Sequence, residues 1–129
     1  MNGLRVLLVE DEEILRQLLE KYMLRIGYEV DTAGSGEAAL TLFHADPEAY
    51  HLILADLSLP GMRGDELMLR ILQANKTVRV LLSSGYPHDL GYLSEFDRSR
   101  AAFLQKPYLP RQLAEQIKRL LPQVREIVA

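Results

Sequence analysis

The sequence contains no cysteine, so disulfide bonds, zinc–thiolate sites and cysteine nucleophiles are excluded. It also lacks any long apolar run. The longest apolar stretches, such as Val6 to Val9, have the length of a strand, and no membrane span is predicted. The opening residues, Met1 to Arg5, lack the charged head and long apolar region of a secretion signal, which favours a cytoplasmic location.

Clustered positive charge is also missing. Fifteen Lys and Arg residues are outnumbered by 18 Asp and Glu residues, the net charge is −3, and no basic block stands out. Direct contact with nucleic-acid phosphates is therefore not expected. The 129 residues, 48% of them hydrophobic and 26% charged, are sufficient for one globular domain, and we expect residues 1–129 to form it.

Short apolar runs of strand length alternate along the chain with longer segments of helical period. The expected strands are residues 4–9, 28–32, 51–55, 78–82 and 101–104. The expected helices are residues 11–26, 35–45, 65–73 and 88–96, and a last one that begins at Pro110 and is ended or kinked by Pro122. Strict alternation predicts right-handed crossovers and a five-stranded parallel sheet with helices on both faces, which is a doubly wound α/β fold.

Polar side chains follow four of the five predicted strands. These residues are Glu10 and Asp11 after the first, Asp56 after the third, Ser83 and Ser84 after the fourth, and Lys106 after the fifth. The carboxyl ends of parallel strands meet at one edge of the sheet, and functional groups of such folds gather there. A functional site at this edge is predicted. Ser83 is expected to be a loop residue with local hydrogen bonds.

Three carboxylates in one place repel one another and raise each other's pKa, and a bound divalent cation removes this conflict. Ligands that are all oxygen suit Mg²⁺. The ion would neutralise a phosphoryl group during transfer, and Lys106 would pair with another of its oxygens. Asp56 is then the natural nucleophile and would form an acyl phosphate, to which a serine hydroxyl can donate a hydrogen bond.

Four segments carry a resemblance to a known family. Val6 to Glu12 resembles the acidic opening of bacterial response-regulator receiver domains, and Asp56 to Gly64 resembles their phosphoacceptor loop. Ser84-Gly85 matches the hydroxyl and small-residue pair of that family, and Lys106-Pro107 matches its lysine and the proline that follows. The resemblance covers essentially the whole chain. It implies a flavodoxin-like receiver with strand order 2-1-3-4-5.

The resemblance implies a role for each matching residue. Asp56 would accept a phosphoryl group from the phosphohistidine of a histidine kinase or a histidine phosphotransfer domain. Asp11, Asp56 and the backbone carbonyl of Ser58 would bind Mg²⁺, while Glu10 would act directly or through a water. Lys106 would contact the phosphoryl group.

The resemblance also implies a conformational switch. Ser84 and Phe103 would couple the phosphorylation site to a partner surface. Phe103 replaces the tyrosine that is common at this position, so an output contact that needs its hydroxyl is unavailable. Ser58 and Tyr86 stand at positions that resemble those tuning the phosphate lifetime. The peptide bond before Pro107 is often cis in this family.

The surface formed by the fourth helix, fifth strand and fifth helix would contact an output domain or a downstream protein. Tyr92, Phe96 and Tyr108 either decorate this surface or cover the edge of the core. The expected activity is that of a regulatory phosphoacceptor rather than an enzyme, and a homodimer is left open. Ser83 to Tyr86 and Phe103 to Tyr108 resemble receivers of hybrid sensor histidine kinases, so a module excised from such a kinase is an alternative.

Two other functions share features with this pattern. A flavodoxin-like protein that binds FMN would need a loop rich in Ser, Thr and Gly after the first strand, whereas Glu10 to Glu13 would repel a ligand phosphate. A phosphatase of the haloacid dehalogenase type would place its nucleophile there, with a second Asp two residues later. Glu13 occupies that position after Asp11, so both alternatives fit poorly.

Overall fold

The computed structural model describes residues 3–121, in which strands and helices alternate as predicted. The strands are β1 (Arg5–Val9), β2 (Glu29–Ala33), β3 (Leu52–Asp56), β4 (Arg79–Ser84) and β5 (Ala101–Gln105). The helices are α1 (Glu13–Arg25), α2 (Gly36–Ala45), α3 (Gly64–Ala74), α4 (Glu95–Arg98) and α5 (Pro110–Leu120). The predicted effect of Pro122 lies outside the described residues. Among those residues, no helix has both the length and the apolar composition that a membrane crossing requires.

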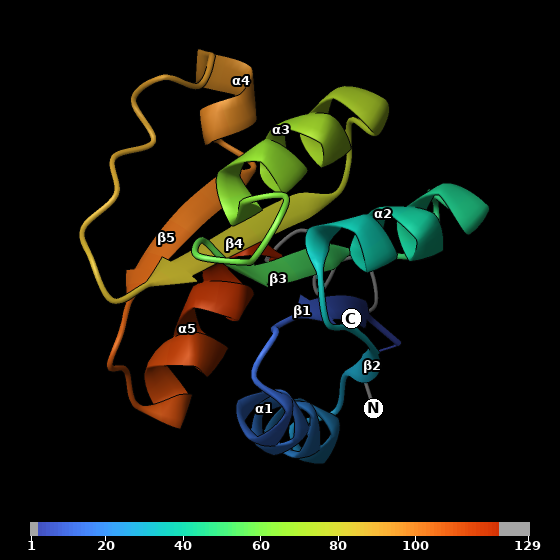
Figure 1. The fold of residues 1–129 in the computed structure, drawn as a ribbon, viewed down its shortest axis with the longest axis vertical. Helices are drawn as coiled ribbons and strands as arrows, with labels where there is room; N and C mark the ends of the chain where they lie inside the picture. The colour runs from blue at the N-terminus through green and yellow to red at the C-terminus, as the bar shows by residue number, and fades with distance from the viewer. Residues whose placement is uncertain (1–2, 122–129) are drawn as a thin grey trace.

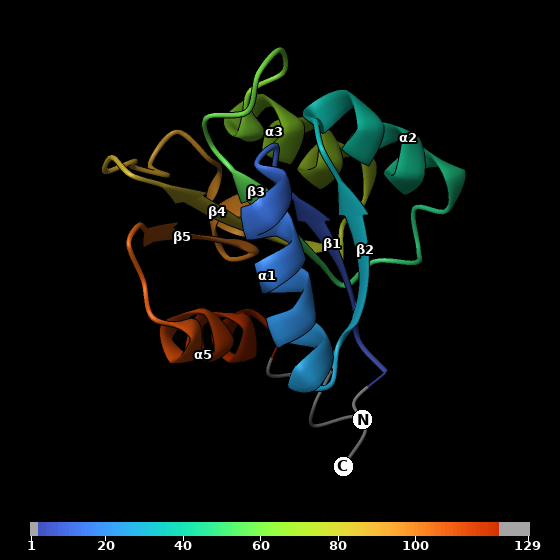
Figure 2. The ribbon, with the colours of Figure 1, turned by 60° about the horizontal axis from the view of Figure 1, so that its bottom comes forward.

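All five strands form one parallel sheet in the order β2-β1-β3-β4-β5. Helices α1 and α5 cover one face, and α2, α3 and α4 cover the other (Figures 1 and 2). The doubly wound, flavodoxin-like fold and its strand order are therefore as expected. The crossovers bring the carboxyl ends of β1, β3, β4 and β5 to one edge of the sheet.

Alternating side chains of the central strands fill two separate hydrophobic cores. Leu7 and Ile53 lie opposite each other in register and pack against α2 and α3, while Val6 and Leu52 face α1 and α5. All four side chains are completely buried. Burial of each such side chain stabilises the fold by about 1.5–3 kcal/mol. The central strands are therefore firmly fixed and give the residues at their ends defined positions.

Local sequence signals place several helix boundaries. The Ser35 hydroxyl accepts a hydrogen bond from the Ala38 backbone N–H at 3.1 Å and caps α2. Pro110 is the first residue of α5. Gly27 follows the C-cap residue Ile26 of α1 and has a φ of 106°, a conformation that favours glycine. These boundaries agree with those predicted to within a few residues.

The predicted helix over residues 88–96 is wrong for most of its length, because α4 contains only Glu95–Arg98. Polar side chains of this segment bind the backbone locally and compete with helical hydrogen bonds. The Asp89 carboxylate accepts a hydrogen bond from the Gly91 N–H at 2.8 Å, which forms a turn. The Ser94 hydroxyl accepts from the Asp97 N–H at 3.1 Å, so the helix starts there instead.

A buried arginine joins α4 to the end of α3. Arg100 is 2% exposed, and its guanidinium donates hydrogen bonds to the carbonyl oxygens of Leu72 at 2.8 Å and Asn75 at 2.6 Å. It also pairs with the Asp97 carboxylate at 2.9 Å. Carbonyls at a helix end have no partner within the helix, and Arg100 supplies one. These bonds compensate its buried charge and fix the start of β5.

Candidate functional site

The carboxylates predicted to converge lie together at the carboxyl edge of the sheet. Glu10 and Asp11 directly follow β1, and Asp56 is the last residue of β3. Because Val9 and Ala55 lie opposite each other in register, the residues that follow them are neighbours. One oxygen atom from each of the three carboxylates lies within 4.8 Å of the others, a spacing that a single metal ion can bridge.

Lys106 reaches this acidic cluster from the adjacent end of β5. Its ammonium Nζ lies 3.6 Å from Glu10 Oε1 and 3.7 Å from Asp56 Oδ2. The Lys106 backbone N–H donates to the Ser84 carbonyl at 2.8 Å, which ties the lysine to β4. The Lys106–Pro107 peptide bond is cis, as the resemblance implied.

Glu10 is the buried member of the cluster, with 2% exposure. The pKa of the Glu10 carboxyl is raised, and burial is the largest cause. The hydrogen bond from the Glu12 N–H at 3.1 Å and the positive charge of Lys106 lower the pKa. The negative charge of Asp56 and a hydrogen bond with Asp11 raise it further. Negative charge at Glu10 is thus disfavoured, and a cation beside it would relieve this cost.

The loop after β3 folds back over the end of its own strand. Asp56 Oδ1 accepts a hydrogen bond from the Ser58 N–H at 3.4 Å, and the Gly64 N–H donates to the Leu57 carbonyl at 2.9 Å. The Asp56 side chain is only 12% exposed, so access to it is narrow. Gly64 packs so closely that an added Cβ would overlap the Asp56 carbonyl oxygen.

A second anchor for this loop comes from α2. Glu37 Oε2 accepts a hydrogen bond from the Met62 N–H at 3.2 Å, and the Met62 side chain packs over Gly36. Gly61 has a φ of 71°, a conformation that favours glycine at the turn. Glu37 was not predicted as a contact of this loop, because an acidic residue in the first turn of a helix has an ordinary explanation in the helix dipole. Together these contacts hold the loop from both ends.

The two predicted switch residues lie on neighbouring strands. Ser84, 2% exposed, ends β4, and its hydroxyl accepts a hydrogen bond from the Tyr86 N–H at 3.1 Å. Phe103 in β5 is half-buried, with its ring centroid 6.0 Å from that of His88. His88 in turn contacts Tyr92, with 2.9 Å between its Nε2 and the Tyr92 hydroxyl. Tyr86 itself is 78% exposed.

Ser83 is not the loop residue that was expected. It lies in β4, opposite Asp56 in register, and is 3% exposed. Strand β4 simply continues two residues beyond the predicted end. Within residues 3–121, the Ser83 Oγ has no hydrogen-bond partner.

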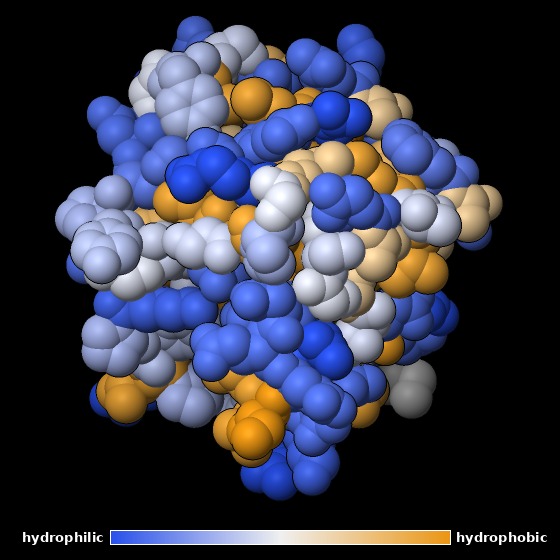
Figure 3. Space-filling view, viewed as in Figure 1, coloured by the Kyte–Doolittle hydropathy of each residue, from blue (hydrophilic) through white to orange (hydrophobic). Residues whose placement is uncertain are grey.

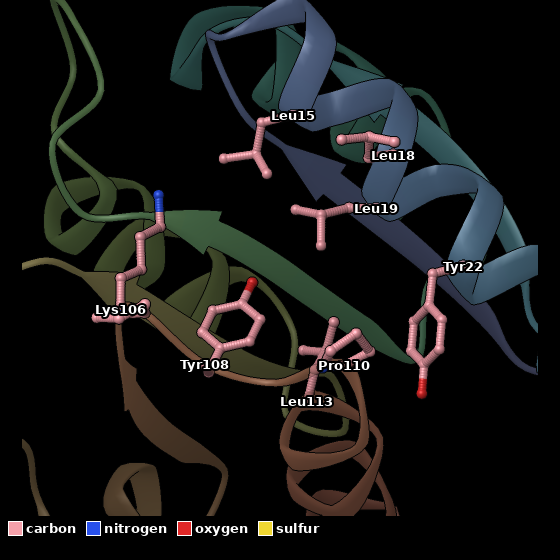
Figure 4. A pocket seen from close by; sticks show the side chains of 9 residues that line it. Leu15, Leu18, Leu19, Tyr22, Lys106, Tyr108, Pro110 and Leu113 are labelled. Atoms are coloured by element: carbon pink, nitrogen blue, oxygen red, sulfur yellow. The ribbon is translucent and has the colours of Figure 1, made fainter.

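An apolar pocket of about 380 Å³ opens beside the acidic cluster, between α1 and α5. Leu15 and Leu19 of α1 face Tyr108 and Leu113 across it, and Lys106 stands at one end (Figure 4). Tyr108 therefore packs against the core, in contrast to Tyr92 and Phe96, which are 51% and 56% exposed near α4.

Helix α1 also exposes large apolar side chains beyond the pocket. Ile14 and Leu18 are 76% and 59% exposed. An apolar patch appears over this helix on a face that is otherwise mostly hydrophilic (Figure 3). Apolar surface thus extends from the acidic cluster along α1 and offers contact area for a partner.

Comparison with known proteins identifies the family of the chain. Residues 6–118 match the family model of the response regulator receiver domain. The regulatory protein VanRB of Enterococcus faecalis is 31% identical over 119 residues, which are 92% of this chain and 53% of VanRB. The chain therefore spans about half the length of that relative.

Two solved structures are also similar. The receiver domain of the hybrid histidine kinase CckA is 32% identical with a TM-score of 0.76, covering 90% of this chain and 98% of the CckA chain. The response regulator TrrA of Thermotoga maritima, solved in complex with Mg²⁺-BeF, is 33% identical with a TM-score of 0.76, covering 92% and 99%. The chain belongs to the response regulator receiver domain family, and its function is that of a signal-transduction receiver of two-component systems.

We expect Glu10→Gln to stabilise the folded chain at neutral pH in the presence of a metal chelator. The raised pKa means that folding disfavours the charged form of Glu10, and the neutral amide removes this cost. The thermal unfolding midpoint should rise by a few degrees.

The matched control is Glu12→Gln, which changes an exposed carboxylate two residues away. Its unfolding midpoint should stay close to that of the unaltered chain. A Glu10→Gln chain no more stable than the Glu12→Gln chain at neutral pH would show that burial of Glu10 carries no net cost.

Proposed function

We propose that residues 1–129 form one receiver in which Asp56 accepts a phosphoryl group from a phosphohistidine. The observation that carries this proposal is the meeting of three carboxylates within 4.8 Å, with the Lys106 ammonium 3.7 Å from Asp56. TrrA, solved with Mg²⁺-BeF, supports it by similarity. The proposed location is the cytoplasm, because a phosphohistidine donor is made from ATP.

The residues at the site fit Mg²⁺, because the donors are oxygens and Glu10 is destabilised as an anion. Asp11, Asp56 and the Ser58 backbone carbonyl would hold the ion, with Glu10 acting directly or through a water. When bound, the ion would neutralise charge on the phosphoryl oxygens. The cluster thus combines a cation site with a phosphoacceptor.

The chain's own side chains would perform the transfer. A carboxylate oxygen of Asp56 bonds to phosphorus while the bond from phosphorus to the donor imidazole nitrogen breaks, and the electron pair returns to that imidazole. Lys106 pairs with a phosphoryl oxygen of the product, and the Ser84 hydroxyl donates a hydrogen bond to another. Asp56 is regenerated by hydrolysis, so the chain is a regulatory phosphoacceptor that assists its own phosphorylation and dephosphorylation.

Phosphorylation would be transmitted through Ser84 and Phe103. For its hydroxyl to turn toward the phosphate, Ser84 has to give up its contact with the Tyr86 N–H. Phe103 and the α4-β5-α5 surface then change together and alter binding of an output domain or a separate target protein. Ser58 and Tyr86 border the phosphate and would set its lifetime.

A second candidate places the same chemistry in a longer protein. The chain covers 98% of the CckA receiver structure but only 49% of the transcriptional regulatory protein ResD, so both a hybrid-kinase receiver and the receiver of a transcription regulator fit its size. In either case the phosphohistidine comes from a histidine kinase or a histidine phosphotransfer domain. The identity of the attached output differs, while the phosphoacceptor site does not.

Beryllofluoride with Mg²⁺ tests the proposal directly. We expect the pair to change the backbone amide NMR signals of Asp56, Ser84 and Phe103, because beryllofluoride imitates the acyl phosphate. Beryllofluoride without Mg²⁺ is the control and should produce little change. Signals that stay unchanged with both reagents present would refute a Mg²⁺-dependent phosphoacceptor at Asp56.

A further inference from the structure

A small cavity adjoins the acidic cluster. Its volume is about 10 Å³, and its polar lining comes from Glu10, Asp56, Ser83, Lys106 and Tyr108. A space of this size holds about one water molecule, and a buried water needs two to four polar partners, roughly what this lining offers. The remaining walls are apolar side chains of β1, β3 and α1.

The Ser83 hydroxyl points to a hydrogen-bonding occupant of this cavity, because it is buried and not fully hydrogen-bonded. Ser83 is 3% exposed and lies beside Asp56 in the sheet. In the described part of the chain its hydroxyl makes no hydrogen bond of 3.5 Å or less, although it is close enough to Tyr108 to affect the pKa of that phenol. Buried hydroxyl groups in proteins nearly always have a partner, either protein or ordered water. Ser83 is one of the residues that line the cavity, so a water there would supply the missing bond.

Tyr108 closes the cavity from the side of the larger apolar pocket, since it lines both. Its hydroxyl is turned toward the carboxyl end of β3 and Lys106, whereas that of Tyr22 points away (Figure 4). Burial raises the pKa of Tyr108 most, the charges of Glu10 and Asp56 add to this, and the nearby Ser83 hydroxyl partly offsets it. The Tyr108 hydroxyl is therefore close to the groups that bear the site's charge.

We propose that one ordered water occupies this cavity and that Tyr108, acting through it, is a positioning residue for phosphoryl transfer. The inference rests on the proposed function of Asp56. Tyr108 and Ser83 hold the water, and the water is bonded to the carboxylate and ammonium groups of the site. The water thereby holds the Asp56 carboxylate and the Lys106 ammonium in place. The atoms of these two groups that do not contact the water face the incoming phosphoryl group.

This arrangement explains why a tyrosine hydroxyl stands on an otherwise apolar wall. The aromatic ring alone would separate the two cavities, so the hydroxyl is not needed for packing. A partner that orients a reacting side chain from behind typically changes affinity or rate when it is removed. Tyr108→Phe keeps the ring and removes only the hydroxyl, so it isolates the proposed role.

The experiment compares Tyr108→Phe, Ser83→Ala and the double variant with the unaltered chain. Tyr22→Phe is the matched control, since it removes the hydroxyl of another tyrosine that lines the same apolar pocket. With Mg²⁺ and saturating acetyl phosphate, Tyr108→Phe should slow phosphorylation about tenfold, while Tyr22→Phe should leave the rate unchanged. Ser83→Ala should add little to Tyr108→Phe, because both act through the same water.

A structural measurement accompanies the kinetics. Water–amide NMR contacts in the unaltered, unphosphorylated chain should reveal a long-lived water beside the Ser83 and Asp56 amides, and Tyr108→Phe should remove it. Absence of that water, equal rates for Tyr108→Phe and Tyr22→Phe, or additive losses from the two variants would each overturn the inference. If the unaltered chain were not phosphorylated at all, the proposed function would fail, and the water measurement would still test the cavity.

Discussion

The Asp56→Asn chain should keep its unmodified mass after incubation with Mg²⁺ and acetyl phosphate, whereas the unaltered chain should gain one phosphoryl group. An amide is a poor nucleophile and cannot form the acyl phosphate, so the expected loss is complete. Asn has the shape of Asp, and one oxygen can still accept the Ser58 N–H. The fold should therefore survive, and intact-mass spectrometry measures the result.

The control for this experiment is Asp46→Asn. Asp46 is an exposed residue directly after α2, outside the acidic cluster. Its variant should be phosphorylated like the unaltered chain. An Asp56→Asn chain that takes up phosphate at the rate of the Asp46→Asn chain would rule out Asp56 as the acceptor.

Gly64→Ala should lower the free energy of unfolding by about 3 kcal/mol, at the upper end of the usual cost of overpacking. An added Cβ would overlap the Asp56 carbonyl oxygen and lie 2.8 Å from the Leu57 Cα. Both are backbone atoms of the sheet edge, which cannot move aside as a flexible side chain can. Alanine gains about 1 kcal/mol in helix propensity over glycine, which does not compensate for this overlap.

Gly85→Ala provides the comparison for Gly64→Ala. No atom lies within 4 Å of an added Cβ at Gly85, and its φ is not positive. Its unfolding free energy should change by at most about 0.5 kcal/mol in urea denaturation. Equal denaturation midpoints for the two variants would mean that the loop after β3 moves freely from the strand end. Gly64→Ala should also slow phosphorylation, since relief of the overlap displaces Asp56.

The sequence was sufficient to predict the sheet and the acidic cluster. The apolar runs that form β1 and β3 have no other stable placement than the middle of a covered parallel sheet. Once those strands are parallel neighbours, the positions of Glu10, Asp11 and Asp56 follow from the chain direction alone. The strand order came from resemblance to the family, because alternation by itself permits several orders.

Two kinds of feature could not be predicted: local side-chain hydrogen bonds that compete with a helix, and contacts between segments distant in sequence. Residues 88–96 were expected to be helical, but the side chains of Asp89 and Ser94 bind the backbone and give a turn and a later helix start. The role of Arg100 depends on carbonyls that end α3, and nothing near it in sequence indicates them. The Tyr108 side chain likewise comes close to Ser83 of β4 only because β5 pairs with β4.

The short α4 has a consequence for how such a receiver could evolve. Residues 85–94 contain no helix, and the segment is held by a few side-chain contacts such as those of His88 with Phe103 and Tyr92. Its rearrangement does not require a helical turn to melt, so the resting and signalling shapes can be close in free energy. Single substitutions in this segment should therefore shift the balance between the two shapes without altering the residues of the acidic cluster.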